Sequence, residues 1–370
     1  MKKSKLKYKL NNKKTQKQKL KIKIKKLKVK KIVSDKEMKN KEGHFFQNSH
    51  FKKIITNNCD VYADNKLLLS FRKNVIPKKI CCQAWDALHK EAQKKHNNRG
   101  AAAGLLDTSN LPKYVRNTTR SQKFRTYYKG KDGKEKKDHL SNSVSSGIIG
   151  YYDKADRNDF QPSNINSLSS KRKKELKKSQ LKKSKKISKM PCRLTKFTKK
   201  ETEKWKKSIP LIIEADKQFK HLVPDRHKSQ IKQAKLTPEF QIKNTAFSTI
   251  TLNYNFRTAT HRDKGDLPEG FGNLLVLEKS ECDNKNSKKF KGSYLGFPQY
   301  GVAVDVRQGD FLAMDVHEWH CNTPLQHSKK VINSGKIGRL SIVCYLRKNM
   351  IKCKSKNKRS RKQNITTKKK

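Results

Sequence analysis

The sequence of 370 residues lacks a long apolar run. Hydrophobic residues make up 33% of it, and no uninterrupted apolar stretch approaches the roughly 20 residues that a membrane-spanning helix needs. The lysine-rich start also lacks the apolar stretch of a secretory signal. We therefore expect a soluble, intracellular protein that is not secreted and does not associate with membranes. No pattern in the sequence demands an obligate protein partner.

Cysteine pairs of the kind that bind structural zinc are also missing. The chain has eight cysteines, and none of them forms a Cys-x-x-Cys motif. Reduced thiols with a packing role are the expectation for an intracellular chain. The adjacent Cys81 and Cys82 fall in a segment with helical spacing, where packing is the preferred interpretation over redox chemistry.

Acidic side chains are scarce relative to basic ones. The chain has 92 lysines and arginines but 31 aspartates and glutamates, which gives a formal net charge of +61. The excess is concentrated in three blocks, residues 1–40, 171–189 and 348–370. Such blocks favour solvated arms that bind the phosphates of nucleic acid without reading its sequence. A lysine-rich composition imposed by an AT-biased genome is a second, compatible explanation for part of the excess.

The apolar residues suffice for one core but not for the whole chain. We expect a single domain at residues 61–350, preceded by a disordered Lys-rich arm at 1–60 and followed by a basic tail at 351–370. A basic surface insertion is expected at 168–190. In residues 20–33, lysine alternates with leucine, isoleucine and valine, which could also form a strand with one charged face. Disorder is preferred because no turn or partner strand follows.

The first part of this domain, to about residue 235, is expected to be mainly helical. Apolar residues recur with helical spacing in 81–95 and 205–221, where Pro210 should mark a kink or a helix start. Residues 61–71 suit a strand or hairpin. The run Arg99-Gly-Ala-Ala-Ala-Gly104 indicates a structural turn rather than a ligand-binding loop.

Strands dominate the second part, a core at residues 240–347. Short apolar segments are separated there by glycine, asparagine, aspartate and proline; they are residues 246–254, 273–278, 301–306, 311–316 and 340–346. This pattern predicts an all-β core with flanking helices, arranged as a double-stranded β-helix or jelly roll.

Three residues in this core have the chemistry of an iron site. His261 and Asp263 are two positions apart, so on an extended segment their side chains point to the same face. His320 follows a buried apolar strand and would complete a set of two imidazoles and one carboxylate, which binds Fe(II) on one face and leaves open positions for a cosubstrate and dioxygen. His317 is the alternative third ligand, disfavoured because the His-x-x-Thr-Pro pattern follows His320.

A basic residue opens the last predicted strand. Arg339 and Ser341 share one face of it, while Leu340 and Ile342 share the other. An inward-facing guanidinium beside a hydroxyl can bind a carboxylate through two hydrogen bonds, which suggests 2-oxoglutarate as the cosubstrate. The alternative is a structural arginine that pairs with a buried acid.

Four ordered segments, residues 244–253, 255–266, 297–301 and 309–324, resemble a known family. They are similar to the TET/JBP class of Fe(II)- and 2-oxoglutarate-dependent nucleic-acid base dioxygenases, and within it to the JBP-type thymine hydroxylases. The resemblance covers residues near 80 to 350 and is strongest from about 191. No segment resembles the separate J-base-binding module of JBP proteins.

The resemblance implies a role for each matching residue. His261, Asp263 and His320 would bind Fe(II), and Arg339 with Ser341 would bind 2-oxoglutarate. Asp266 falls where the family places a polar residue that reads the target base. The aromatic side chains that could wall the base pocket are those of Phe256, Phe297, Tyr300 and Trp319.

The implied activity is oxidation of the 5-methyl group of 5-methylcytosine or thymine, using O2, in nucleic acid and most simply in DNA. A protein with this activity would be located in the nucleus or another DNA-containing compartment such as a viral factory. Two alternatives are an oxygenase that hydroxylates a protein or small molecule, and a noncatalytic basic protein that binds nucleic acid. The intact ligand set argues against the latter.

Overall fold

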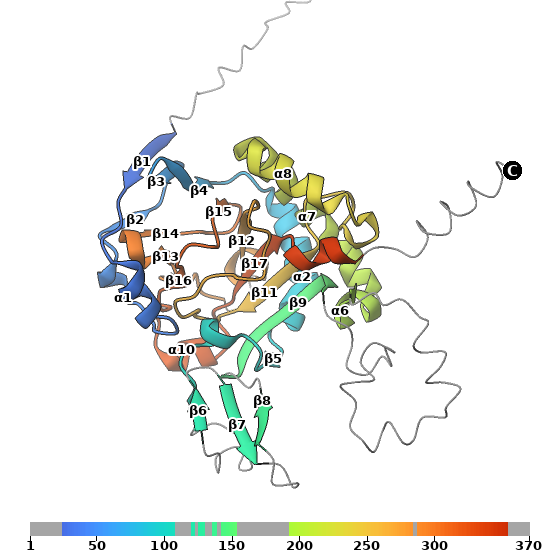
Figure 1. Cartoon of the computed structure of the whole chain (residues 1–370). Coiled ribbons are helices and arrows are strands. Elements are labelled where there is room, and N and C mark those ends of the chain that lie inside the picture. The colour runs from blue at the N-terminus through green and yellow to red at the C-terminus, as the bar shows by residue number, and fades with distance from the viewer. Residues whose placement is uncertain are drawn as a thin grey trace, which may run out of the picture.

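The computed structural model describes residues 24–107, 120–122, 125–129, 135–138, 142–153, 192–283 and 287–353. The predicted insertion at 168–190 and nearly all of the basic tail lie outside these residues. The described chain is a mixed α+β structure in which a large β-sheet has helices on one face and a smaller sheet on the other (Figure 1). No helix in these ranges is long and apolar enough to cross a membrane.

The large sheet has ten strands, antiparallel except at one edge. Its order is β1 (Lys25–Val29), β3 (Cys59–Ala63), β4 (Lys66–Arg72), β15 (Phe311–Met314), β12 (Gly272–Glu278), β17 (Arg339–Tyr345), β11 (Thr249–Tyr254), β9 (Val144–Tyr152) and β10 (Arg193–Leu194), with β5 (Lys95–His96) also paired to β9. Strand β1 runs parallel to β3. Sequence and spatial order differ: the four central strands β15, β12, β17 and β11 come from the C-terminal half of the chain, and strands of the N-terminal half lie on both sides of them.

The smaller sheet has four strands and covers one face of the large one. Its order is β16 (Cys321–Asn322), β13 (Leu295–Phe297), β14 (Val302–Val304) and β2 (Lys53–Ile55). Apolar side chains of both sheets, such as Leu274, Met314 and Val304, form one buried cluster between them. A separate sheet joins β6 (Arg120–Gln122), β7 (Arg125–Lys129) and β8 (Glu135–Asp138).

Helices cover the other face of the large sheet. They are α2 (Lys78–Ala92), α6 (Lys196–Lys200) and α7 (Thr202–Leu222), with α8 (Pro224–Ala234) packed on α7 (Figure 1). Leu275, Phe311 and Ile342, which alternate with residues of the opposite face, pack against these helices. Pro210 lies inside α7, so the predicted helix begins earlier than the proline and continues through it.

The remaining helices of the described residues are short. They are α1 (Asp35–Asn40), α9 (Lys279–Cys282) and α10 (Lys329–Asn333), and the 3-10 helices η1 (Asn48–His50), η2 (Gly100–Ala103), η5 (Pro238–Phe240), η6 (Pro298–Tyr300) and η7 (Lys348–Lys352).

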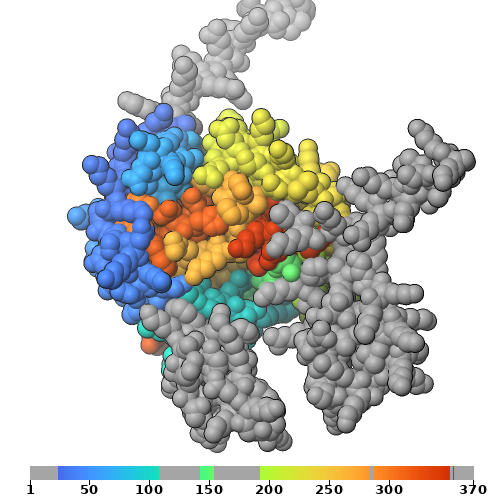
Figure 2. All heavy atoms as spheres, viewed as in Figure 1, coloured from blue at the N-terminus to red at the C-terminus, as the bar shows by residue number. Residues whose placement is uncertain are grey.

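The prediction of a disordered arm at residues 1–60 is wrong for residues 24–60; residues 1–23 lie outside the described chain. Strand β1 is the alternating segment, and its partner β3 lies about thirty residues further along the chain. Helix α1 is capped by Ser34 and Glu37 and buries Met38. Figure 2 shows these blue N-terminal residues beside the orange C-terminal half. The local pattern could not reveal order that depends on partners remote in sequence.

The expected helical character of the domain up to residue 235 is also only partly right, because β3, β4 and β9 from this part belong to the large sheet. Residues 61–71, for which a strand or a hairpin was expected, form most of the hairpin of β3 and β4. Asp64 and Asn65 turn between them with φ of 48° and 61°, the left-handed values that asparagine and aspartate tolerate best after glycine. The five strands predicted after residue 240 are all present.

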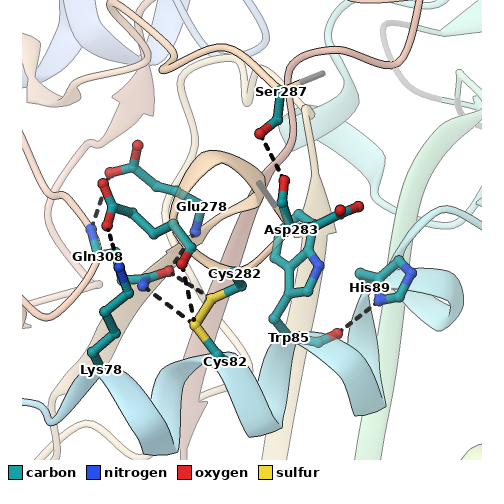
Figure 3. Close-up of a disulfide and its surroundings, with 10 residues drawn as sticks. Lys78, Cys82, Trp85, His89, Glu278, Cys282, Asp283, Ser287 and Gln308 are labelled. Carbon is teal, nitrogen blue, oxygen red and sulfur yellow. Dashed lines mark hydrogen bonds and ion pairs between the residues drawn. A yellow bond between two sulfur atoms is a disulfide. The ribbon is translucent and has the colours of Figure 1, made fainter. Parts of the chain in front are cut away.

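The expectation of reduced cysteines is contradicted at two places. Cys82 on α2 is bonded to Cys282 on α9, with the Cα atoms 4.9 Å apart (Figure 3), and Cys192 is bonded to Cys353. Each pair is separated by more than 150 positions in sequence. Cys81, the neighbour of Cys82, is a free buried thiol, as its packing interpretation predicted.

Candidate active site

A cavity of about 320 Å³ lies on the face of the large sheet that is turned away from the helices. Its wall includes Thr251 and Asn253 of β11 and alternate residues of β17, namely Arg339, Ser341, Val343 and Tyr345. The intervening residues Leu340, Ile342 and Cys344 are buried on the helical side. The predicted division of this strand into two faces is therefore confirmed.

His261, Asp263 and His320 come together in this cavity. Their ligand atoms all lie within 4.8 Å of one another. The Nε2 atom of His261 is 3.6 Å from Asp263 Oδ1, and that of His320 is 3.9 Å from Oδ2. His261 and His320 face each other across an antiparallel bridge, with reciprocal backbone hydrogen bonds of 3.0 Å. This bridge brings together ligands that are far apart in sequence.

Hydrogen bonds orient both imidazoles for a metal. Nδ1 of His261 is 2.7 Å from the Ala259 carbonyl oxygen, and Nδ1 of His320 is 2.9 Å from that of Glu318. A carbonyl can only accept, so Nδ1 carries the proton and Nε2 keeps its lone pair. Burial, and then the neighbouring His320, lower the pKa of His261 to about 4, which keeps its ring neutral. The donor set fits Fe(II).

The alternative ligand His317 lies outside the triad. Its Nε2 is 3.2 Å from the Leu267 carbonyl oxygen, and its backbone N–H donates to Asp315.

Arg339 occupies a second part of the cavity. It is 2% exposed, and its Nε and Nη2 atoms are buried without a hydrogen-bond partner. Burial, followed by the nearby charge of Arg307, lowers the pKa of Arg339 to about 10, so the guanidinium stays charged at neutral pH. Nε and Nη2 form one edge of the guanidinium, which can donate to both oxygens of a carboxylate. These residues fit the distal carboxylate of 2-oxoglutarate.

The backbone around Arg339 is fixed from both sides. Its N–H donates to Asn255 Oδ1 at 2.8 Å, and its carbonyl accepts from the N–H of Asn255 at 2.9 Å. Ser341 lies opposite Asn253 in the sheet, and both side chains line the cavity. The two contacts with Asn255 thus anchor the start of the strand that carries Arg339.

The part of the cavity beyond the triad is polar and charged. Asp266 is buried there, and burial together with the charge of Asp263 raises its pKa well above the usual value. The backbone of Asp266 pairs with that of Arg347 in an isolated antiparallel β-bridge, and the Arg347 side chain forms an ion pair with Asp153, with Nε 2.7 Å from Oδ1. The structure therefore brings Asp266 to the same cavity as the triad.

The predicted aromatic walls need correction. Phe256 lines the cavity, but Phe297 and Tyr300 do not, because both are buried in the apolar cluster between the two sheets. The Tyr300 hydroxyl donates to Glu318 at 2.9 Å. Trp319 is also buried outside the cavity lining, with the guanidinium of Arg262 4.4 Å from its ring centroid.

Two segments of the cavity wall were not predicted from the sequence. Asn98, Arg99, Ala101 and Ala102 line the cavity, so the turn interpreted as structural lies at the site. Glu42, from the predicted arm, also lines it. The alanines of this turn were the one local signal of a site, since their small side chains let another segment or a ligand approach the backbone closely. The Ala259 N–H donates to the Ala102 carbonyl at 2.9 Å.

Comparisons with known proteins agree with this chemistry. A family model described as the oxygenase domain of the 2OGFeDO superfamily, Tet_JBP, matches residues 180–348. Thymine dioxygenase JBP1 of Trypanosoma brucei brucei is 34% identical over 158 residues, which are 43% of this chain and 17% of that protein. Bifunctional helicase and thymine dioxygenase JBP2 of Trypanosoma brucei brucei (strain 927/4 GUTat10.1) is 36% identical over 163 residues, 43% of this chain and 13% of that protein.

A solved structure, NgTET1 in complex with 5mC DNA, aligns with a TM-score of 0.44 and 12% identity over 90% of this chain and 100% of that chain. The match to each curated relative covers less than a fifth of its length. Residues 180–348 therefore match an oxygenase domain of the 2OGFeDO superfamily, and the cluster of His261, Asp263 and His320 within them is the ligand set of an Fe(II)- and 2-oxoglutarate-dependent dioxygenase domain.

Proposed function

We propose that this dioxygenase domain oxidises the 5-methyl group of a pyrimidine, thymine or 5-methylcytosine, in DNA. One observation carries the proposal: three metal-ligand side chains and an unpartnered buried guanidinium face one cavity, within the segment that matches the Tet_JBP model. The similarity to thymine dioxygenases supports a pyrimidine methyl as the target. We further propose that the two facing sheets form a double-stranded β-helix.

In this proposal each part of the cavity has one task. His261, Asp263 and His320 hold Fe(II), while Arg339 and Ser341 hold 2-oxoglutarate. With O2, these cofactors supply the chemistry that converts a methyl C–H into C–OH and 2-oxoglutarate into succinate and CO2. Asp266 and Phe256 would contact the base beyond the triad. Phe297 and Tyr300 are not assigned to the base, because they are buried elsewhere.

The protein's own residues position the reactants and exclude water. Fixed Nδ1 protons on both histidines prevent the rings from turning away from the metal. Leu274, Leu295 and Met314 give the cavity an apolar wall that limits water near the triad. A base stacked in a duplex cannot reach this cavity, so the target nucleotide would have to be extruded into it.

We propose that DNA is attracted mainly through the lysine-rich segments, within a DNA-containing compartment. The net charge of +61 supports strong phosphate binding that weakens steeply with salt. Most of the basic blocks lie outside the described residues. In the described part, Lys25, Lys26 and Lys28 of the edge strand β1 add exposed positive charge.

The test is to incubate the full chain with Fe(II), 2-oxoglutarate and DNA that contains either unmodified bases or 5-methylcytosine, and to measure nucleosides by mass spectrometry. A hydroxymethyl pyrimidine is expected, from the wild type and from His317→Ala but not from His320→Ala. His317 is the matched control because it is a nearby histidine outside the triad. Succinate without an altered base would reject this substrate class in favour of a protein or small molecule.

A further inference from the structure

The carboxylate of Glu278 lies close to the guanidinium proposed to bind 2-oxoglutarate. Glu278 ends β12 and is directly opposite Arg339 in the pairing of β12 with β17. Opposite residues of an antiparallel pair point to the same face, with Cβ atoms about 4.5–5.5 Å apart. Glu278 is 3% exposed. A buried carboxylate at this position could bind Arg339 itself and exclude a carboxylate ligand.

Other residues occupy both oxygens of Glu278. Arg307 donates from Nη2 to Oε2 at 2.9 Å, and the backbone N–H of Gln308 donates to Oε1 at 3.1 Å. The Gln308 side chain accepts from the N–H of Glu278 at 2.9 Å, which fixes the strand end (Figure 3). Glu278 therefore makes its hydrogen bonds with Arg307 and Gln308, while Nε and Nη2 of Arg339 have none.

Phe290 connects the two guanidiniums. The guanidinium carbon of Arg307 is 3.7 Å from the centroid of the Phe290 ring, and that of Arg339 is 5.5 Å from it. Arg307 also donates from Nη1 to the Phe290 carbonyl at 2.9 Å. Both cations lie within the usual range of cation–π attraction, about 6 Å, so one buried ring keeps both side chains in place.

We propose that Arg307 is a positioning residue that keeps Arg339 available for 2-oxoglutarate by binding the competing carboxylate of Glu278. The inference rests on the proposed role of Arg339 in cosubstrate binding. Without Arg307, Glu278 would be a buried carboxylate without a cationic partner beside an unpartnered guanidinium, and pairing of the two would satisfy both. Glu278 would then inhibit cosubstrate binding by occupying Arg339.

The test measures the dissociation constant of 2-oxoglutarate by calorimetry on the full chain, with Mn(II) as a redox-inert substitute for Fe(II). Arg307→Met should weaken binding by roughly tenfold or more, the size expected when one hydrogen-bonded charge pair competes with another. Arg307→Met combined with Glu278→Gln should return the constant to within about threefold of the wild type, because a neutral amide competes weakly. Mn(II) affinity should be unchanged in both variants.

Arg72→Met is the matched control. Arg72 is also buried and pairs with Asp60 at 2.8 Å, but it does not line the cavity. Its removal should lower stability without changing 2-oxoglutarate affinity. If Arg307→Met does not fold, Glu278→Gln alone still tests the idea, since it should bind 2-oxoglutarate at least as well as the wild type.

Two results would overturn the inference. One is unchanged affinity in Arg307→Met; the other is weak binding that Glu278→Gln does not restore, which would mean a merely structural role. Both outcomes differ from failure of the proposed function, in which the wild-type chain itself would bind no 2-oxoglutarate in the presence of Mn(II).

Discussion

Replacement of Arg339 by lysine tests the cosubstrate site most directly. The Nε and Nη2 atoms of Arg339 are buried without a partner in the cavity, and together they present one edge with two parallel donors. A lysine ammonium keeps the positive charge but offers a point charge in place of this edge. It should lose at least one of the two hydrogen bonds to the distal carboxylate.

A hydrogen bond to a charged group contributes about 1.5–3 kcal/mol. Loss of one such bond should therefore weaken 2-oxoglutarate binding by roughly 10- to 150-fold. Metal affinity should be unaffected, because Arg339 is not among the three clustered ligands. The Asn255 contacts should persist, since they involve the backbone of residue 339.

The assay is calorimetric titration of 2-oxoglutarate into the Mn(II)-loaded chain, compared with a separate titration of Mn(II). Arg72→Lys, at a buried arginine that is not part of the cavity lining, controls for a general effect of the substitution. Equal affinity of wild type and Arg339→Lys would refute the two-donor reasoning. A parallel loss of Mn(II) binding would show that the substitution disturbed the whole site.

Three further perturbations have defined outcomes. His261→Ala or Asp263→Ala should abolish metal binding and turnover yet leave DNA affinity in a gel-shift titration nearly unchanged, because the positive charge lies mainly in the lysine-rich blocks. An equal loss of turnover and DNA affinity would contradict this separation of the iron site from DNA binding. Cys82→Ser should lower the free energy of unfolding in urea by up to about 5 kcal/mol under non-reducing conditions, since the bond to Cys282 closes a 200-residue separation; an unchanged midpoint would refute the crosslink. Burial raises the pKa of Asp310 to about 6, above its value in the unfolded chain. The stabilisation by protonated Asp310 is therefore present at low pH and is lost as pH rises from about 4 to 6, by at most about 3 kcal/mol. In denaturation curves, the free energy of unfolding of Asp310→Asn should vary less with pH across this window than that of the wild type.

Local sequence patterns were sufficient to predict features that depend on a single strand or turn. The alternation of Arg339, Ser341 and Val343 with buried residues follows from the two-residue period of a strand, and the structure confirms it. The clustering of His261 with Asp263 is similarly local. The hairpin at 61–71 required only two apolar runs and a turn that tolerates left-handed residues.

Aromatic residues near a motif were a weaker guide. Phe256 and Phe297 looked equivalent in sequence, yet Phe256 lines the cavity and Phe297 lies between the sheets. Burial of a large apolar ring stabilises either location, so residue type cannot distinguish a pocket wall from the core. Cysteine spacing also failed to predict the disulfide between Cys82 and Cys282, because these residues meet only through the packing of α2 on α9.

The amino-acid sequence by itself determined the polycationic character, the strands of the core and the choice of His261, Asp263 and His320 as candidate metal ligands, since charge, periodicity and ligand chemistry are properties of single residues and short segments. Tertiary structure alone decided that residues 24–60 join both sheets, that Glu42 and the Arg99 turn wall the cavity, and that Arg307 rather than Arg339 holds Glu278. These features depend on contacts between segments about 30 to 250 positions apart, and such contacts leave no periodic pattern in the sequence of either segment.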